Sequence, residues 1–258
     1  MGVKSLLDLS GRVALITGGS RGLGLQIAEA LGEMGAKLAI TARKQDELDS
    51  AVAHLQKQHI QAISQVCDIG KREAIAPLAD AVLKKFGKVD ILVNNAGATW
   101  GAPAEQHPLE AWDKLVNVNL SGAFALTQLI GRQSMIPAKW GRIINVASIA
   151  GLLGQDPRFA ATAAYTATKH GLIGLTRQLA AEWGVHGITV NAICPGFFPS
   201  KMTRATLDTA GKAVLEVTPT RRLGNDEDLK GLAVLLASEA SRHITGQAIA
   251  VDGGATVI

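Results

Sequence analysis

The stretch VALITGGSRGLG, residues 13–24, decides the fold of this chain. Its first five residues are apolar or β-branched and predict a short buried strand, and a helical pattern of apolar residues follows the glycines. Gly18, Gly22 and Gly24 lie at the junction, where glycine permits a tight turn and close approach of the backbone to a phosphate. The start of the helix adds N–H donors and a positive dipole. The spacing TGxxxGxG therefore indicates a dinucleotide-binding loop, with a plain strand–helix turn as the alternative.

The alternation of strand and helix continues along the whole chain. Further strands are predicted from apolar runs over residues 37–41, 62–66, 89–95, 142–148, 188–194 and 247–254. Helical patterns lie between them, including long ones near 109–135 and 162–183. Several of the runs are apolar on both faces, as in a parallel sheet covered by helices. We therefore predict an α/β fold, a doubly wound parallel sheet flanked by helices, in a single domain over residues 1–258.

Composition excludes several classes of protein. Two cysteines, Cys67 and Cys194, cannot form a disulfide framework or a four-cysteine zinc site, and the six histidines are scattered, so no metal is expected. No apolar run reaches the ~18 residues of a membrane span, and the first residues lack a signal-peptide pattern, so we expect a cytoplasmic protein without a membrane partner. The 26 basic residues are spread along the chain, which argues against nucleic acid despite a net charge of +4.

The end of the second strand indicates which dinucleotide is bound. An NAD-binding chain usually offers an acidic residue there for the ribose 2′-hydroxyl, but this strand ends with Arg43 and Lys44. Asp46 and Glu47 fall in the first turn of the next helix, where they suit its dipole. Arg43 and Arg21 are placed to hold a 2′-phosphate, although both are also compatible with ordinary surface positions. We therefore predict NADP(H) in preference to NAD(H).

The single tyrosine of the chain, Tyr165, precedes Lys169 by four residues. In a helix this spacing places both side chains on one face. A free phenol has a pKa near 10, and a neighbouring ammonium favours the phenolate, so we expect the pKa of Tyr165 to be lowered. Ser148 ends the fifth predicted strand and can hydrogen-bond a substrate carbonyl. Each of these features is common by itself, because pairs at this spacing often only decorate helices.

In combination, these motifs resemble the short-chain dehydrogenase/reductase family over about residues 10–254. The resemblance is carried by TGGSRGLG (17–24), CDI (67–69), NNAG (94–97), NVNLSG (117–122), Ser148, YTATK (165–169), CPG (194–196) and VDGG (251–254). It implies a Rossmann-type, seven-stranded sheet and a nicotinamide-dependent oxidoreductase. The loop sequences look more similar to gluconate 5-dehydrogenase-type relatives than to 3-oxoacyl carrier-protein reductases.

The resemblance also implies a role for each matched residue. Tyr165 is the general acid and base, Lys169 lowers its pKa and holds the nicotinamide ribose, Ser148 polarises the substrate oxygen, and Asn119 anchors a water of the proton relay. The implied cofactor contacts are Gly18, Ser20, Arg21, Gly22, Leu23, Gly24, Arg43, Asp68, Ile69, Asn94, Asn95, Ala96, Gly97, Tyr165, Lys169, Pro195, Gly196, Phe198 and Ser200.

The substrate mouth departs from the usual family pattern. Tyr165 follows Ser148 by 17 positions, a few more than in many relatives, so the intervening loop is longer. Its candidate substrate contacts, suited to a polar or anionic compound, are Gln155, Asp156, Arg158 and Phe159, and further walls are expected from Trp100 and from a lid over about residues 197–224.

We expect a polyol, a sugar acid or a similar small carbonyl compound as substrate. A 3-oxoacyl carrier protein is the alternative, weakened because Ala181-Glu182 stands where such enzymes carry a basic docking residue. A non-catalytic NADP(H) sensor is the remote alternative. The resemblance further implies a homotetramer, assembled through the helices near 109–135 and 162–183 and the last strand.

Overall fold

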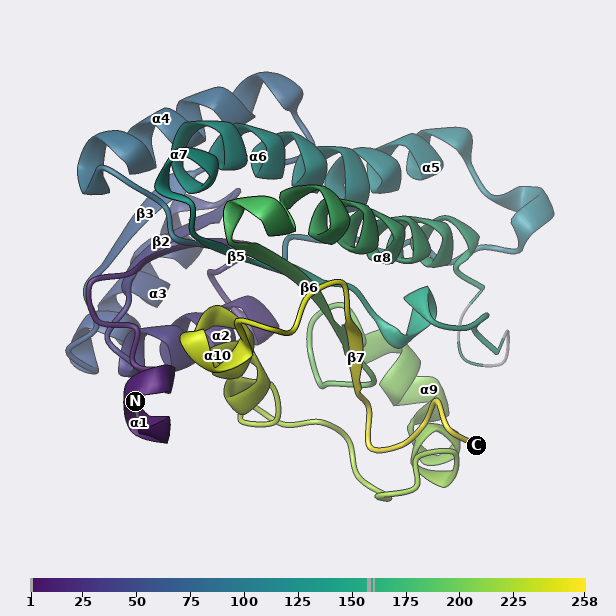
Figure 1. Ribbon diagram of the computed structural model, residues 1–258. Coiled ribbons are helices and arrows are strands. Elements are labelled where there is room, and N and C mark those ends of the chain that lie inside the picture. Colours follow the sequence, from purple (N-terminus) through teal and green to yellow (C-terminus); the bar gives the residue numbers. More distant parts are fainter. Residues whose placement is uncertain (1, 157–158, 160) are drawn as a thin grey trace.

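A computed structural model describes residues 2–156, 159 and 161–258. Within this part of the chain, seven strands form one parallel sheet in the order β3-β2-β1-β4-β5-β6-β7 (Figure 1). The strands are β1 (Val13–Thr17), β2 (Lys37–Ala42), β3 (Ala62–Val66), β4 (Ile91–Asn94), β5 (Gly141–Val146), β6 (Ile188–Pro195) and β7 (Ala248–Val251). The predicted fold is therefore confirmed, with strand ends within a few residues of those expected.

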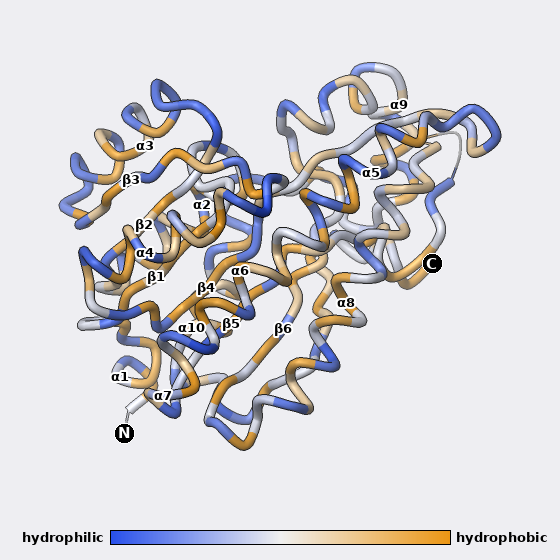
Figure 2. The backbone as a smooth tube through the Cα atoms, turned by 90° about the horizontal axis from the view of Figure 1, so that it is seen from above, coloured by the Kyte–Doolittle hydropathy of each residue, from blue (hydrophilic) through white to orange (hydrophobic). Residues whose placement is uncertain are grey.

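Helices cover both faces of the sheet (Figure 1). One face carries α2 (Gly22–Glu33), α3 (Gln45–Lys57) and α10 (Lys230–Ala237). On this face α2 and α3 pack against β1, β2 and β3, and α10 packs against β5, β6 and α2. The other face carries α4 (Ile75–Phe86), α6 (Gly122–Ile130) and α8 (Ala163–Trp183). The central strands are buried on both faces, as Figure 2 shows by the mostly hydrophobic colouring of β1, β4 and β6. This two-sided burial explains their continuous apolar runs.

The long helix predicted near 109–135 is divided by two wider turns. It consists of α5 (Leu109–Val116), a π-helical segment Asn117–Ser121, α6, a second π-helical segment Gly131–Met135, and the short α7 (Ile136–Ala138). Such π segments often mark functional sites. The first of them contains Asn119, one of the residues that the sequence assigns to the active site.

Two helices were not expected from the sequence. A short α1 (Val3–Leu7) precedes the first strand, and α9 (Arg204–Glu216) lies within the predicted lid. In both views α9 lies away from the sheet, on the side where the strands end (Figures 1 and 2). No helix within the described ranges is long and apolar enough to cross a membrane.

The strand order reverses between β1 and β4, which creates the place where ligands bind in open α/β sheets. The chain leaves β1 toward β2 and β3, then returns to pair β4 with the opposite edge of β1. The carboxyl ends of β1 and β4 therefore begin two loops that diverge from one crevice. The glycine loop follows β1, and the NNAG segment follows β4.

Candidate active site

The glycine loop is shaped by steric constraints that only glycine satisfies. Gly18 and Gly22 have φ angles of +65° and +53°, in the left-handed region that strains other residues. A Cβ at Gly24 would collide with the carbonyl oxygen of Gly18 and with the side-chain amide of Asn95. The Gly18 carbonyl therefore packs directly against the backbone of α2 at Gly24, with no room for a side chain between them. The N-terminus of α2 is left facing the crevice, a cradle that suits the pyrophosphate of a dinucleotide.

The NNAG segment braces this loop from the neighbouring strand. The Asn95 side-chain amide donates to the carbonyl oxygens of Thr17 (2.9 Å) and Gly18 (3.0 Å). In return, the Thr17 hydroxyl accepts from the backbone N–H groups of Asn95 and Ala96, both at 3.0 Å. The two loops at the switch point are therefore held together by four hydrogen bonds. Thr17 is a structural member of the site that motif reasoning had not singled out.

Asn94 and Asn95, adjacent in the motif, face different surroundings. Asn94 is 4% exposed, and its amide donates to Thr127 (2.9 Å) and Asn145 (2.8 Å) inside the protein. Its side chain therefore ties β4 to β5 and α6. The next residues, Ala96 and Gly97, follow the strand end and border the crevice.

The end of β3 supplies the predicted adenine contacts. Asp68 is half-buried, and one of its carboxylate oxygens accepts from the backbone N–H of Gly70 at 3.1 Å. It thus closes its own turn, while Ile69 packs in the core at 6% exposure. This local hydrogen bond fixes the direction of the Asp68 carboxylate.

Charged side chains gather where the glycine loop meets the first turn of α3. The Glu47 carboxylate pairs with Arg21 at 2.7 Å and with Lys44 at 3.4 Å. The Ser20 hydroxyl lies 3.5 Å from its other oxygen. Arg43 is exposed and forms no ion pair with any residue that the structure describes. The sequence had assigned Glu47 to the helix dipole, whereas its side chain turns back toward the glycine loop.

The predicted catalytic side chains come together at the end of β5. The phenol of Tyr165 lies close enough to the side chain of Ser148 for that hydroxyl to lower its pKa, and the same hydroxyl accepts from the Ala150 N–H at 3.1 Å. Lys169 lies one turn after Tyr165 in α8, with its ammonium 5.6 Å from the centre of the phenol ring. That ammonium is 2.7 Å from the carbonyl oxygen of Val146, to which it donates.

Burial dominates the proton affinities of this cluster. It raises the pKa of Tyr165 above its ordinary value of 10.0, and the hydrogen bond from Ser148 opposes the rise only in part. Burial lowers the pKa of Lys169 to about 8, because a desolvated ammonium is costly. The expected lowering of the tyrosine pKa by the lysine is therefore not found among the protein's own residues. The physical reason is that desolvation of the phenolate dominates, and Lys169 is not among the groups that shift the pKa of Tyr165.

Cys194 lies beneath the catalytic side chains, in β6. It is fully buried, its thiol is hydrogen-bonded by the backbone of Ser148, and burial raises its pKa to about 11. The thiol therefore stays protonated at neutral pH. Its role is to pack under Ser148, in agreement with the sequence interpretation of a small core residue.

Asn119 connects α5 and α6 to the crevice. It is 1% exposed, and its side chain exchanges two hydrogen bonds with the backbone of Ala98, at 2.8 and 3.0 Å. Its amide also donates to the hydroxyl of Thr168 at 3.0 Å, which links it to the helix that carries Tyr165 and Lys169. Thr168 was not identified from the sequence, although it lies inside the YTATK motif.

The substrate mouth is built from three loops. Ala102 donates its N–H to the carbonyl oxygen of Ala161 at 2.9 Å, so the loop after β4 pairs with the loop before α8. Phe159 meets Phe197 edge to face, with ring centres 6.3 Å apart, which joins the long loop to the lid. Trp100 is 46% exposed on the first loop.

The other predicted mouth residues belong to the long loop before α8. Gln155 and Asp156 are half-buried in the long loop, and Phe159 donates its N–H to the Asp156 carbonyl oxygen at 2.9 Å. Arg158, the basic candidate for substrate contact, lies outside the described residues.

The lid begins where β6 ends. Gly196 donates its N–H to the Val251 carbonyl oxygen at 3.0 Å, and the ring of Phe198 is 3% exposed, packed on Gly224. Ser200 forms a turn with Thr203 through a hydroxyl contact of 3.0 Å.

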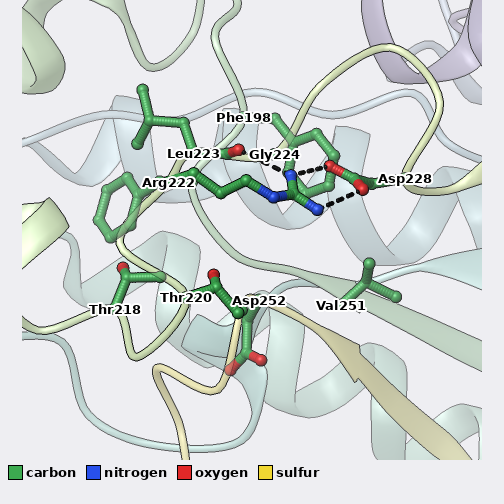
Figure 3. Close-up of a pocket in the computed structure, with 11 residues that line it drawn as sticks. Phe198, Thr218, Thr220, Arg222, Leu223, Gly224, Asp228, Val251 and Asp252 are labelled. Carbon is green, nitrogen blue, oxygen red and sulfur yellow. Dashed lines mark hydrogen bonds and ion pairs between the residues drawn. The ribbon is translucent and has the colours of Figure 1, made fainter.

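A pocket lies beside Phe198, lined also by Thr218, Thr220, Val251 and Asp252 (Figure 3). On its rim, Arg222 and Asp228 form two hydrogen bonds of 2.6 and 2.8 Å. The pocket lining contains none of the predicted catalytic residues. Phe198, a predicted cofactor contact, therefore packs its side chain between Gly224 and this pocket.

Comparison with known proteins agrees with this architecture. The family model described as short chain dehydrogenase matches residues 12–211. A gluconate 5-dehydrogenase of Gluconobacter oxydans (strain 621H) is 37% identical over 98% of this chain and 97% of its own length. A 3-oxoacyl-[acyl-carrier-protein] reductase of Staphylococcus epidermidis is 38% identical over 93% and 97%, respectively.

Solved structures give the same result. The structure of a gluconate 5-dehydrogenase from Burkholderia cenocepacia J2315, in complex with NADP and tartrate, has a TM-score of 0.94 and 34% identity and is covered over the full length of both chains. Identity and coverage of this extent, together with the family model, show that the resemblance inferred from the motifs is correct. The chain belongs to the short-chain dehydrogenase family and is an oxidoreductase that acts on alcohol and carbonyl groups.

Proposed function

We propose that this protein interconverts a ketone and a secondary alcohol on a small polar compound, a polyol or a sugar acid, with NADP(H) as cofactor. The observation that carries the proposal is the juxtaposition of the Tyr165 phenol with the Ser148 side chain, with the Lys169 ammonium 5.6 Å from the centre of the phenol ring. This pair lies at the carboxyl end of β5, two strands from the glycine loop. Bound NADP(H) supplies or takes up the hydride in such a reaction.

In the direction of reduction, the Tyr165 hydroxyl donates its proton to the carbonyl oxygen of the substrate. Its raised pKa keeps this proton in place at neutral pH, so the residue is ready as an acid. Ser148 donates a second hydrogen bond to the same oxygen and stabilises the negative charge that develops there. In the direction of oxidation, the phenolate removes the proton from the alcohol.

We assign Lys169 and Asn119 to the transfer of protons between solvent and Tyr165. With a pKa of about 8, the Lys169 ammonium exchanges protons close to neutral pH. Asn119 lies beyond it, bonded to Thr168 and Ala98, and we assign it the anchoring of a water that connects the lysine to solvent. Gly97 lies between the two, since a Cβ built there would be 3.5 Å from Asn119 Oδ1 and 3.7 Å from Lys169 Nζ.

The preference for NADP(H) rests on charge at the edge of the glycine loop. Arg21 lies in the glycine loop, and Arg43 and Lys44 follow the end of β2, where the ribose 2′-substituent is expected. A 2′-phosphate suits guanidinium groups. Relatives with bound NADP support this choice, because the solved gluconate 5-dehydrogenase of Burkholderia cenocepacia contains it.

The sugar-acid assignment is supported by relatives from both comparisons that are gluconate 5-dehydrogenases. The second candidate is a 3-oxoacyl thioester on an acyl carrier protein, favoured by the relative from Staphylococcus epidermidis. In this chain Glu182 is exposed on α8 where a basic docking residue is expected, and an acid there repels an acidic carrier. The sugar acid therefore ranks first.

We also propose a homotetramer, because α5 and α6 expose large apolar side chains. Leu109 is 75% exposed, Trp112 39% and Phe124 42%. Large apolar patches on a protein surface usually mark a site that another protein chain covers. Light scattering after size exclusion measures the mass directly, and a monomer of 26.9 kDa at micromolar concentration would contradict the proposal.

The test is turnover of NADPH and NADH with sugar acids, polyols and acetoacetyl thioesters, with Tyr165→Phe as the decisive variant. We expect Tyr165→Phe to lower kcat about 10³-fold, because the ring remains and only the transferable proton is lost. Thr166→Val removes a hydroxyl from the next position of α8 and is expected to keep kcat within twofold. Tight cofactor binding without turnover on any substrate would instead support a sensor.

A further inference from the structure

Glu47 occupies an unusual position for an acidic residue beside a predicted phosphate site. It lies in the first turn of α3, and its side chain is 23% exposed. One carboxylate oxygen is 2.7 Å from Arg21 Nη1 and 3.4 Å from Lys44 Nζ. The other lies 3.5 Å from the Ser20 hydroxyl. The carboxylate thus connects α3 to the glycine loop through the side chains that are expected to meet the cofactor.

The charges around Glu47 set up a competition. Arg21 and Lys44 are 51% and 61% exposed, so both can reorient toward a ligand. A 2′-phosphate carries up to two negative charges and seeks the guanidinium that the carboxylate already holds. To bind Arg21, the phosphate has to displace Glu47 or accept a negative charge beside it, and like charges at such short range are unfavourable.

Arg43 differs from Arg21 in this respect. It is exposed at the end of β2, and within the described residues it has no acidic partner. The two arginines are therefore not equally available to bind a phosphate. Arg43 is available without a rearrangement, whereas Arg21 has to leave an ion pair first.

We propose that Glu47 is a specificity-determining residue whose carboxylate competes with the cofactor 2′-phosphate for Arg21. In this way it limits how strongly the enzyme prefers NADP(H) over NAD(H). The inference rests on the proposed binding of a 2′-phosphate between Arg21 and Arg43. It predicts that neutralising Glu47 selectively strengthens binding of the phosphorylated form, since NAD(H) has no group that needs Arg21.

The experiment measures binding of two small probes to the full-length protein by calorimetry, without any catalytic step. Adenosine 2′,5′-bisphosphate carries the 2′-phosphate, and 5′-AMP is the same molecule without it. The ratio of their Kd values isolates the contribution of that phosphate. We expect Glu47→Gln to raise the preference for the bisphosphate roughly fivefold, the upper range for release of a partly exposed ion pair.

Asp46→Asn is the matched control. Asp46 precedes Glu47 on the same helix turn, and removal of its charge changes the net charge equally. Its side chain is exposed, and Arg21 pairs with Glu47 and not with Asp46. We expect this variant to change the ratio less than twofold. An equal effect of both substitutions would overturn the inference, because the cause would then be long-range charge. An unchanged or reduced ratio in Glu47→Gln would overturn it as well.

Arg43→Ala separates this inference from the proposed cofactor preference. If the parent protein prefers the bisphosphate and Arg43→Ala removes that preference, the proposed phosphate site stands, and Glu47→Gln alone decides the inference. If the parent protein shows no preference, the proposed function is wrong in that respect. The inference then survives only if Glu47→Gln creates a preference.

Discussion

The cofactor side and the substrate side of the crevice are built in different ways. On the cofactor side, the glycine loop and the NNAG segment are held by backbone contacts and by the exchange of hydrogen bonds between Thr17 and Asn95. On the substrate side, one backbone hydrogen bond joins Ala102 to Ala161, and the long loop meets the lid through side chains, in the edge-to-face contact of Phe159 with Phe197. Backbone contacts tolerate few changes, whereas side-chain contacts exchange easily. One family can therefore keep its cofactor site and vary its substrate.

Gly24→Ala disrupts the glycine loop on the cofactor side and has the largest expected effect of the proposed substitutions. The added methyl group meets the Gly18 carbonyl oxygen and the Asn95 amide, so the loop has to open. We expect cofactor Kd to rise at least about 100-fold, equivalent to roughly 3 kcal/mol, measured by calorimetry with NADPH. Gly231→Ala is the control, because a Cβ there meets no atom within 4 Å in α10. Cofactor binding that survives in Gly24→Ala would show that the cradle adapts.

Lys169 lies between the cofactor side and the substrate side, and its shifted pKa makes the free energy of unfolding depend on pH. Because its folded-state pKa is about 8 against an ordinary 10.5, the unfolded chain binds one more proton between these pH values. The contribution of Lys169 to the free energy of unfolding therefore rises with pH over this window, by on the order of 2 kcal/mol. Cys67 and Cys194, whose pKa values burial raises to about 11, contribute in the opposite direction above pH 9, and that contribution is common to the parent protein and its variants. Lys169→Met removes this rise, as urea unfolding at pH 7.5 and 10 can measure.

A lysine on the surface provides the comparison for this measurement. Lys85→Met, on the exposed end of α4, keeps the pH dependence of the parent protein. If Lys169→Met also keeps it, the lysine is not desolvated as the structure indicates. The link between burial and proton affinity at the centre of the site would then be wrong.

Phe159→Ala changes only the substrate side and has the smallest expected effect. Loss of the aromatic contact with Phe197 loosens the long loop against the lid, and such pairs contribute about 0.5–1.5 kcal/mol. Substrate KM should rise roughly two- to tenfold while the Kd for NADPH stays within twofold. Phe159→Leu keeps apolar packing and should recover part of the loss. Equal losses in KM and cofactor Kd would contradict the separation of the two sides.

The difference between the two sides also explains how much could be predicted. The glycine pattern of residues 17–24 fixed the first turn, because positive φ angles and close contacts leave no other residue type. The spacing of Tyr165 and Lys169 placed both on one face of α8, as helix geometry requires. These inferences follow from local geometry, which a sequence pattern expresses directly.

The features that were missed depend on distant residues. The π-helical segment that contains Asn119 has the same apolar periodicity as an uninterrupted helix, so nothing in the sequence separates them. Glu47 reads as an ordinary residue of a first helical turn until the fold brings it to Arg21. The direction of the tyrosine pKa was also missed, because desolvation depends on what surrounds the phenol and not on its neighbour in the helix.

The most direct test of the central claim uses the fact that Tyr165 is the only tyrosine in the chain. Its ionisation can be followed by phenolate absorbance, with Tyr165→Phe as the blank. In the protein without cofactor we predict a pKa above the ordinary 10.0, because burial dominates. Addition of NADP⁺ should lower it, because the positive nicotinamide ring favours the phenolate. Ionisation at the ordinary value, unchanged by NADP⁺, would contradict the assignment of Tyr165 as the proton donor of this site.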